Sequence, residues 1–294
     1  MTEAVLAPTR SGRVLRAMHI VRGFPYVACT VLGLIVISAV FAPLISPQPP
    51  SAISLVDAMT PPAWQAEGNS EFLLGTDNLG RDILSRIIAG ARVSVTIALY
   101  AIVLSGGIGT LLGMAAGYFG GVVDALISRL IDVQMSVPAF PLAMLFAAVL
   151  QPGEAMVVFI IVLTYWTWYA RIVRGEVLSL RERDFIALAK VAGVSTPVIF
   201  LRHLVPNVLN TLLVLATLQF GSVIVFEAGL SFVGLGIQPP QVSWGGMLSD
   251  GRNFIEVGWW LITIPGVVIM SACLASNLLG DWLRDTLDPM RRQL

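Results

Sequence analysis

Six long apolar segments alternate along the chain with polar segments of varied length. None of them contains Asp, Glu, Lys or Arg, and most match the roughly 17 to 25 residues that cross a bilayer as a helix. They are Pro25–Ile45, Val93–Ala116, Val133–Leu150, Ala155–Ala170, Val208–Phe226 and Val257–Leu279. The fourth is short at its charge-free core and is expected to extend into Ile172 and Val173. The pattern predicts an all-α polytopic membrane protein with six transmembrane helices.

The composition agrees with a lipid-facing surface. Of the 294 residues, 56% are hydrophobic and only 12% are charged, whereas a soluble domain carries about 25% charged residues. The formal net charge is zero, which argues against a nucleic-acid partner.

The basic residues predict the orientation. If the N-terminus is cytoplasmic, 14 of the 18 Lys and Arg residues lie on the cytoplasmic side and four outside, in agreement with the positive-inside rule. The cytoplasmic parts are then the tails 1–24 and 281–294, the loop 171–206 and the short segment that contains Arg129. The outer loops are 46–92 and 227–256, and residues 93–280 form a five-helix core.

The outer loop 46–92 ends in an apolar helical pattern. Its face is formed by Ile83, Leu84, Ile87, Ile88 and Ala91. We expect either a helix lying in the membrane interface or part of a dock for a binding protein.

The loop 171–206 is basic and has its own helical pattern. One apolar face is formed by Leu178, Phe185, Leu188, Ala189 and Ala192. Gly193 suits a left-handed C-terminal cap, Ser195 or Thr196 a cap for a second helix, and Pro197 its first turn. Pro206 is expected to mark the return to the membrane. The sequence predicts two short helices around a glycine turn.

This loop has two interpretations. A basic loop that only fixes topology needs charge alone. An apolar face with paired caps favours a docking surface for a soluble partner, since an amphipathic helix can lie in a partner's groove.

Nucleotide chemistry is not expected in this chain. Lys190 is its only lysine and lies between Ala189 and Val191, whereas a phosphate-binding loop needs Gly-Lys-Ser/Thr. Cys29, Cys273, His19 and His203 show no metal-ligand spacing. We therefore expect no cofactor here, and any ATP and Mg²⁺ to be bound by partner subunits.

Four segments resemble the peptide and nickel branch of the ATP-binding-cassette importer permeases. Gly193 precedes Pro206 by 13 positions, the spacing of that family's cytoplasmic loop motif, Glu-Ala-Ala, three residues, Gly, nine residues, Ile, one residue, Leu-Pro. The flanking Phe-Ile-Ala-Leu-Ala-Lys-Val-Ala-Gly-Val-Ser is also similar. The others are Leu74–Arg86, Glu227–Pro240 and Ala275–Pro289. The resemblance covers roughly Leu74 to Pro289.

The resemblance implies a type I importer transmembrane domain in a bacterial plasma membrane. Its partners would be a second homologous permease subunit, two ATPase subunits and an outer substrate-binding protein. The loop would couple to the ATPase through Arg181, Asp184, Phe185, Ala187, Ala189, Lys190, Gly193, Arg202, His203 and Pro206. The sequence departs from the motif where Ala187 replaces Glu, Leu188 the first Ala, His203 the Ile and Val205 the Leu.

Two weaker patterns lie within the predicted spans. Ser105, Gly109, Gly113 and Gly117 form a ridge of small residues at spacing four, which allows close helix packing within the subunit or a dimer. Pro138 and Pro141 open the third span, and Pro265-Gly266 is predicted to interrupt the sixth. Each proline site is a candidate hinge.

The substrate expected from the resemblance is a di- or oligopeptide, with nickel or another small solute as the alternative. A secondary transporter is the rival from another class. It is disfavoured because no charged residue lies in the middle of any predicted span. A membrane-embedded enzyme is disfavoured because no catalytic groups converge.

Overall fold

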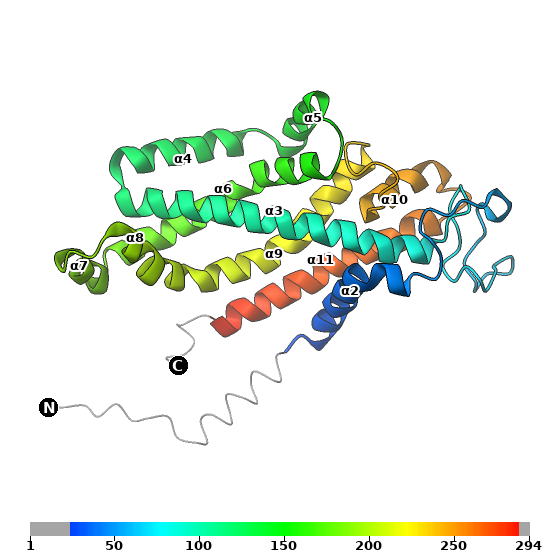
Figure 1. The fold of residues 1–294 in the computed structure, drawn as a ribbon, viewed down its shortest axis with the longest axis horizontal. Helices are drawn as coiled ribbons and strands as arrows, with labels where there is room; N and C mark the ends of the chain where they lie inside the picture. The colour runs from blue at the N-terminus through cyan, green and yellow to red at the C-terminus, as the bar shows by residue number, and fades with distance from the viewer. Residues whose placement is uncertain (1–23, 288–294) are drawn as a thin grey trace, which may run out of the picture.

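The computed structural model describes residues 24–287 as a long bundle of helices (Figure 1). The helices are α2 (Tyr26–Ile45), α3 (Ile83–Phe119), α4 (Gly121–Ser136), α5 (Ala139–Val149), α6 (Glu154–Arg181), α7 (Asp184–Val191), α8 (Thr196–Ile199), α9 (Val205–Phe232), α10 (Trp244–Gly251) and α11 (Trp260–Leu287). A π-helical segment, Phe200–Leu204, joins α8 to α9. Short 3₁₀ turns lie at Leu55–Asp57 and Arg252–Phe254.

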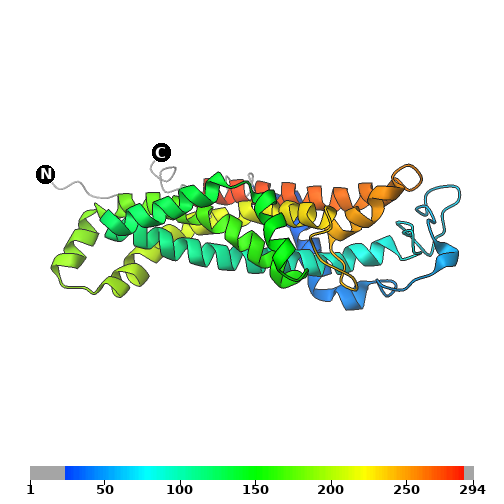
Figure 2. The ribbon, with the colours of Figure 1, turned by 90° about the horizontal axis from the view of Figure 1, so that it is seen from above.

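The bundle has two distinct ends. Helices α7 and α8 lie at one end, and residues 46–82 with α10 lie towards the other, as both views show (Figures 1 and 2). We call these the α7 end and the α10 end. The long helices α3, α6, α9 and α11 run between them.

Five helices are long and apolar enough to cross a membrane: α2, α3, α6, the run from α8 to α9, and α11. A sixth span results if α4 and α5 are counted as one bent unit. The counts of five and six spans refer to residues 24–287. The predicted all-α polytopic fold is thus confirmed.

The third predicted span is not one straight helix. Instead of Val133–Leu150, the chain forms α4 and α5, bent by 88°. The bend falls at Val137, whose φ of −91° and ψ of 123° are extended, directly before Pro138. A residue that precedes proline is disfavoured in the helical region, which explains the break.

Helix α4 begins earlier than the predicted span and includes charged residues. Asp124 and Asp132 lie on α4, outside any charge-free segment. Asp124 accepts a 2.7 Å hydrogen bond from Arg174 of α6, and Asp132 one of 2.9 Å from Arg171. The charges are paired across two helices, so they are compatible with helix packing.

Residues 83–91 are helical as predicted, but they do not form a separate interfacial helix. These residues form the first turns of α3, which continues without a break through Arg92 into the predicted second span. Asp82 caps the helix, accepting from the backbone N–H of Ser85. The residues of the predicted interfacial face are therefore the start of α3, which is 37 residues long.

The small-residue ridge on α3 packs against α6. A Cβ on Gly113 would lie 2.6 Å from the carbonyl oxygen of Ala170, and one on Gly117 would lie 2.9 Å from Val177. Gly109 approaches the backbone of Trp166 even more closely. Ser105 is buried and donates to the carbonyl of Ala101. The glycines therefore let the backbone of α3 approach both the backbone and the side chains of α6 closely.

Helix α11 also differs from its predicted span. It continues through Pro265 without the predicted interruption, and extends to Leu287. Residues 281–287 of the predicted C-terminal tail are therefore helical. The predicted tail 1–24, except residue 24, and residues 288–294 lie outside the described residues.

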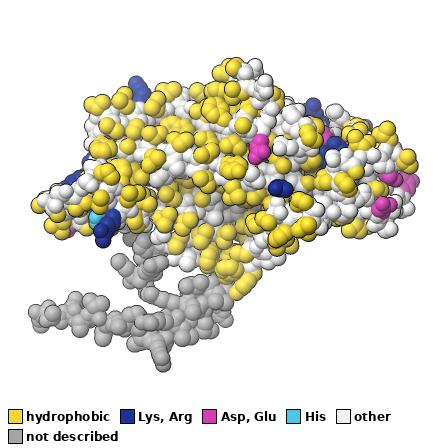
Figure 3. Space-filling model, viewed as in Figure 1, with side chains coloured by type: hydrophobic (Ala, Val, Ile, Leu, Met, Phe, Trp, Pro, Cys, Tyr) yellow, Lys and Arg dark blue, Asp and Glu magenta, His cyan; other side chains and the backbone are white. Residues whose placement is uncertain are grey.

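Hydrophobic side chains dominate both the interior and the surface. The main core joins α3, α6, α9 and α11, and a second one lies under α7. Hydrophobic side chains also cover much of the face shown in Figure 3. A surface of this kind suits lipid or other transmembrane helices.

Candidate coupling loop and outer ion-pair network

Helix α7 is set apart from α6 by a short break. Helix α6 ends at Arg181, and α7 begins at Asp184 after the extended Arg183. The break changes the register of the apolar face. Leu178 belongs to α6 and does not share a face with the residues of α7, so the face predicted from Leu178 to Ala192 is not continuous.

The inward side of α7 is formed by Ile186 and Ala189. Ile186 is fully buried and Ala189 is 8% exposed, both in the second core with Val173 and Leu180 of α6. The buried side of α7 therefore faces its own subunit. Ala189, predicted to contact an ATPase, is covered by this core.

The outward side of α7 is also apolar. Leu188 is 68% exposed and Val191 is 87% exposed. We call Leu188 and Val191 the apolar ridge. Phe185 is less exposed, at 36%, and its ring lies 6.1 Å from the His203 ring. Phe185 is one of the predicted coupling residues, but Leu188 and Val191 are more exposed.

Gly193 ends α7 in the predicted left-handed conformation, with φ of 74°. Its N–H donates to the carbonyl of Lys190, and the N–H of Val194 donates to the carbonyl of Ala189, both at 3.0 Å. These two bonds form a Schellman motif. A Cβ on Gly193 would meet no atom within 4 Å, so the position requires glycine for its backbone and not for space.

The second predicted short helix is continuous with α9. Helix α8 starts after Ser195 with Pro197 in its first turn, as predicted, but Ser195 makes no side-chain cap bond. The π-helical segment then joins α8 directly to α9. Pro206 therefore lies in the first turn of α9, within a continuous helical run. Its expected place at the return to the membrane stays a prediction.

The π-helical segment accommodates Pro206. Proline has no N–H and its ring collides with the carbonyl four residues earlier in a regular helix. Directly before it, the N–H of Val205 bonds to the carbonyl of Phe200, five residues back. The wider turn lets the helix pass through the proline.

The other predicted coupling residues occupy three kinds of position. Arg181 donates to the Gly117 carbonyl at 3.3 Å and to Glu182 at 3.1 Å. The Lys190 ammonium lies 4.8 Å from the Tyr118 ring centroid on α3. Asp184, Ala187, Arg202 and Pro206 are exposed, and His203 is half-buried. The structure thus gathers these residues at the α7 end, some facing the subunit and some facing outwards.

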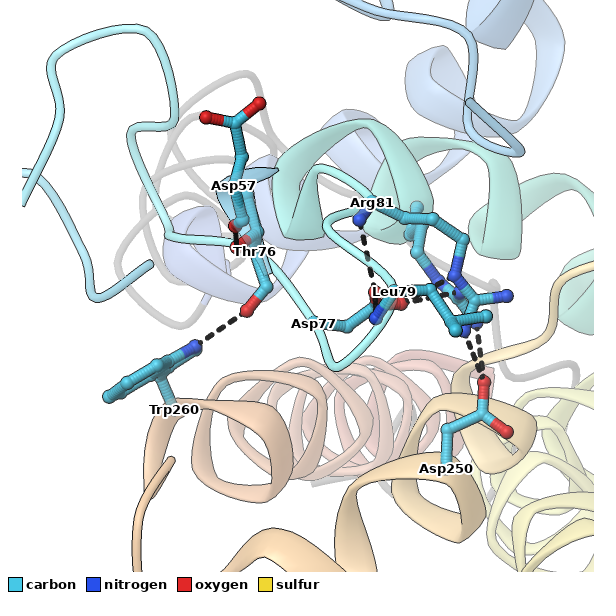
Figure 4. A network of polar contacts seen from close by, with 8 residues as sticks. Asp57, Thr76, Asp77, Leu79, Arg81, Asp250 and Trp260 are labelled. Carbon is cyan, nitrogen blue, oxygen red and sulfur yellow. Dashed lines mark hydrogen bonds and ion pairs between the residues drawn. The ribbon is translucent and has the colours of Figure 1, made fainter. Parts of the chain in front are cut away.

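At the α10 end, four charged side chains form one network (Figure 4). Asp77 accepts from Arg81 at 2.6 Å and from Arg86 at 2.7 Å. Asp250 of α10 accepts from the same two arginines, at 3.0 and 2.9 Å. We call these residues the outer network, because they lie in the two loops that the sequence predicts to be outside, 46–92 and 227–256. It fastens the segment before α3 to α10.

Neighbouring hydrogen bonds extend this attachment. Asp77 also accepts from the backbone N–H groups of Leu79 and Arg81. The Trp260 indole donates to the Thr76 carbonyl at 3.0 Å, joining the same loop to α11 (Figure 4). Sequence reasoning counted Arg81 and Arg86 only as outer charges. Their position inside the motif Leu74–Arg86 was the available signal for a structural role.

A buried carboxylate, Glu227, was also missed. Helix α9 continues beyond the predicted end at Phe226, so Glu227 lies within it and is only 1% exposed. It accepts from Ser231 at 2.7 Å and from Ser94 of α3 at 3.2 Å. Glu227 lies five residues before the end of α9 and outside the predicted span Val208–Phe226. The expectation that no charged residue lies in the middle of a predicted span therefore stays a prediction.

Comparisons with known proteins cover most of the chain. Residues 109–293 match the family model described as binding-protein-dependent transport system inner membrane component. The di/tripeptide transport system permease protein DppC of Pseudomonas aeruginosa is 43% identical over 87% of this chain and 84% of its own length. The nickel transport system permease protein NikC of Escherichia coli is 37% identical over 89% and 92%.

A solved structure supports the same fold. The chain is similar to an inward-facing structure of the MetNI methionine ABC transporter, with a TM-score of 0.54 and 16% identity. The match covers 68% of this chain and 96% of the other. At that identity the similarity concerns the arrangement of helices alone.

Proposed function

The chain belongs to the family of inner-membrane components of binding-protein-dependent transport systems, and on that premise we propose that it is the permease subunit of an ATP-driven importer of short peptides. The proposed substrate rests on the 43% identity, over most of both chains, to a di/tripeptide permease. The chain itself would form half of the transport path and perform no chemistry.

In this proposal, transport is driven by ATP hydrolysis in two partner ATPase subunits. Lys190, the only lysine, lies in α7 beside Tyr118, and its sequence context is not that of a phosphate loop. ATP and Mg²⁺ would therefore be bound by the partner subunits. The proposed docking element is α7, whose apolar ridge offers an exposed hydrophobic surface on a short helix.

The remaining partners follow from the family. A second homologous permease would pack beside this one and complete the path. A substrate-binding protein would approach the α10 end, and both chain termini and α7 would face the cytoplasm. That orientation rests on the excess of Lys and Arg on this side.

Nickel is the second candidate substrate, because a nickel permease is 37% identical over 89% of this chain. A secondary carrier is the rival mechanism. The family relationship supports an ATP-driven system instead.

Uptake by cells tests the proposal. Cells with the complete transporter should accumulate radiolabelled alanylalanine, and deletion of this chain should abolish uptake while the other subunits remain at normal levels. A catalytic-site variant of the partner ATPase should abolish it equally. Uptake of ⁶³Ni²⁺ without peptide uptake would favour the second candidate, and uptake that persists without the ATPase would favour a secondary carrier.

A further inference from the structure

A cavity of about 450 Å³ lies between α6, α9 and α11, towards the α7 end. Small-molecule sites commonly have volumes of about 300–1,000 Å³. The polar side chains that line this cavity are Glu176, Asn207, Asn210, Thr211 and Arg284. It lies away from the outer network and from the exposed ridge of α7.

Glu176 has an unsatisfied atom in this cavity. Its Oε2 atom is buried and has no hydrogen-bond partner. Thr211 lies beside the carboxylate, and within residues 24–287 no Lys or Arg forms an ion pair with it. A buried polar atom without a partner is costly, so a ligand that donates hydrogen bonds and carries positive charge would be stabilised here.

The opposite charge borders the same cavity. Arg284 of α11 also lines it, and it pairs with no carboxylate in the described part of the chain. Asn207 and Asn210 of α9 present amide groups that can both donate and accept. One cavity thus combines a carboxylate, a guanidinium and two amides.

We propose that this cavity is a binding site for zwitterionic short peptides on their way through the subunit. Glu176 holds the α-ammonium group, Arg284 holds the terminal carboxylate, and the asparagines contact the peptide bond. The inference rests on the proposed function and adds to it a place and a recognition chemistry. Free amino acids carry the same two charged groups but lack the peptide bond, so they would not make the contacts with the asparagines.

A cysteine protection experiment tests the site in the assembled transporter. Cys29 and Cys273 are replaced by Ser, and Val214→Cys, at a lining position with no assigned contact to the peptide, provides one reactive thiol in the cavity. Alanylalanine should slow modification of this thiol by a small maleimide at least threefold. N-acetyl-alanylalanine amide, which lacks both charges, should give no protection at the same concentration.

Variants identify the groups responsible. Glu176→Gln should raise the peptide concentration needed for half-maximal protection about tenfold. Hydrogen bonds to charged groups contribute more binding energy than hydrogen bonds between neutral groups. Arg284→Gln should act similarly. Glu67→Gln, an exposed carboxylate in the outer loop, is the matched control and should leave protection unchanged.

The outcomes separate the two proposals. Equal protection by the charged and uncharged peptides, or unchanged protection in both Glu176→Gln and Arg284→Gln, would overturn the charge recognition. Peptide uptake without any protection would overturn this cavity as a site and leave the proposed function standing. Protection without peptide uptake would support the cavity and count against the transport proposal.

Discussion

The guanidinium of Arg86 lies 2.9 Å from the carboxylate of Asp250, a residue 164 positions further along the chain. The two residues differ in burial, since the Arg86 side chain is 5% exposed and that of Asp250 is 44% exposed. Arg86 also satisfies Asp77, which is equally buried. This pairing joins the start of α3 to α10. The loss of one partner should therefore cost more stability at the buried Arg86 than at the half-exposed Asp250.

Arg86→Ala should therefore destabilise the protein far more than Asp250→Ala. Breaking a buried pair costs about 3–5 kcal/mol because it leaves an uncompensated charge. A half-exposed partner contributes about 1 kcal/mol or less. Thermal unfolding in detergent, followed by size-exclusion chromatography, measures the difference. Arg92→Ala, at an exposed position of the same helix, is the control, and equal losses in all three variants would refute the role of the network.

The glycine ridge gives a steric prediction. Gly113→Val should reduce the amount of folded protein in the membrane, because a Cβ there lies 2.6 Å from the Ala170 carbonyl. Overpacking of this kind costs about 1–3 kcal/mol or more. Gly107→Val on the same helix is the control, since its Cβ would meet nothing within 4 Å. Similar membrane levels for the two variants would contradict the close packing of α3 and α6.

Gly193 gives a backbone prediction. Gly193→Val should strain the end of α7 by about 1–2 kcal/mol, since left-handed backbone is unfavourable for residues with a Cβ. We expect normal membrane levels but ATP hydrolysis that no longer drives transport. Gly193→Asn should behave close to the parent because Asn tolerates this conformation. Full transport by the Val variant would show that the turn is dispensable for coupling.

The apolar ridge predicts where the partner ATPase binds. Truncation of an interface anchor typically costs about 2 kcal/mol or more, so Leu188→Ala combined with Val191→Ala should strongly reduce ATPase co-purification in mild detergent. Phe185→Ala should have a smaller effect because its ring already packs near His203. Glu182→Ala serves as the exposed-charge control. If Phe185→Ala causes the greater loss, the ranking taken from side-chain exposure is wrong.

The orientation can be tested by labelling in intact cells. In a background with Cys29 and Cys273 replaced by Ser, Glu67→Cys should react with a membrane-impermeant reagent added outside. Ser195→Cys should react only after the membrane is opened. Reaction of Ser195→Cys in intact cells would reverse the proposed topology.

Features set by neighbouring residues could be predicted from the sequence. The left-handed Gly193 cap depends on hydrogen bonds within six consecutive residues, so the local pattern was sufficient. The apolar cores of the straight spans were equally visible, because lipid imposes the same requirement on every turn of a helix.

Features set by distant residues could not be predicted in the same way. Asp124 of α4 and Arg86 of α3 pair with Arg174 and Asp250, which lie on other helices far along the chain. The buried Glu227 accepts a hydrogen bond from Ser94, 133 positions away. The register of α7 depends on the break at Arg183 and on the core beneath Ile186. Such partners are unknown until the fold brings them together.

The unbroken length of α3 has a mechanical consequence. At 1.5 Å per residue, 37 residues extend about 55 Å, well beyond the roughly 30 Å of a hydrocarbon core. Near one end Arg86 belongs to the outer network, and near the other Tyr118 contacts Lys190 of α7. Because the helix is unbroken, it joins the contact with α7 directly to the outer network. We therefore expect a tilt imposed through α7 to move Arg86 and α10 as well.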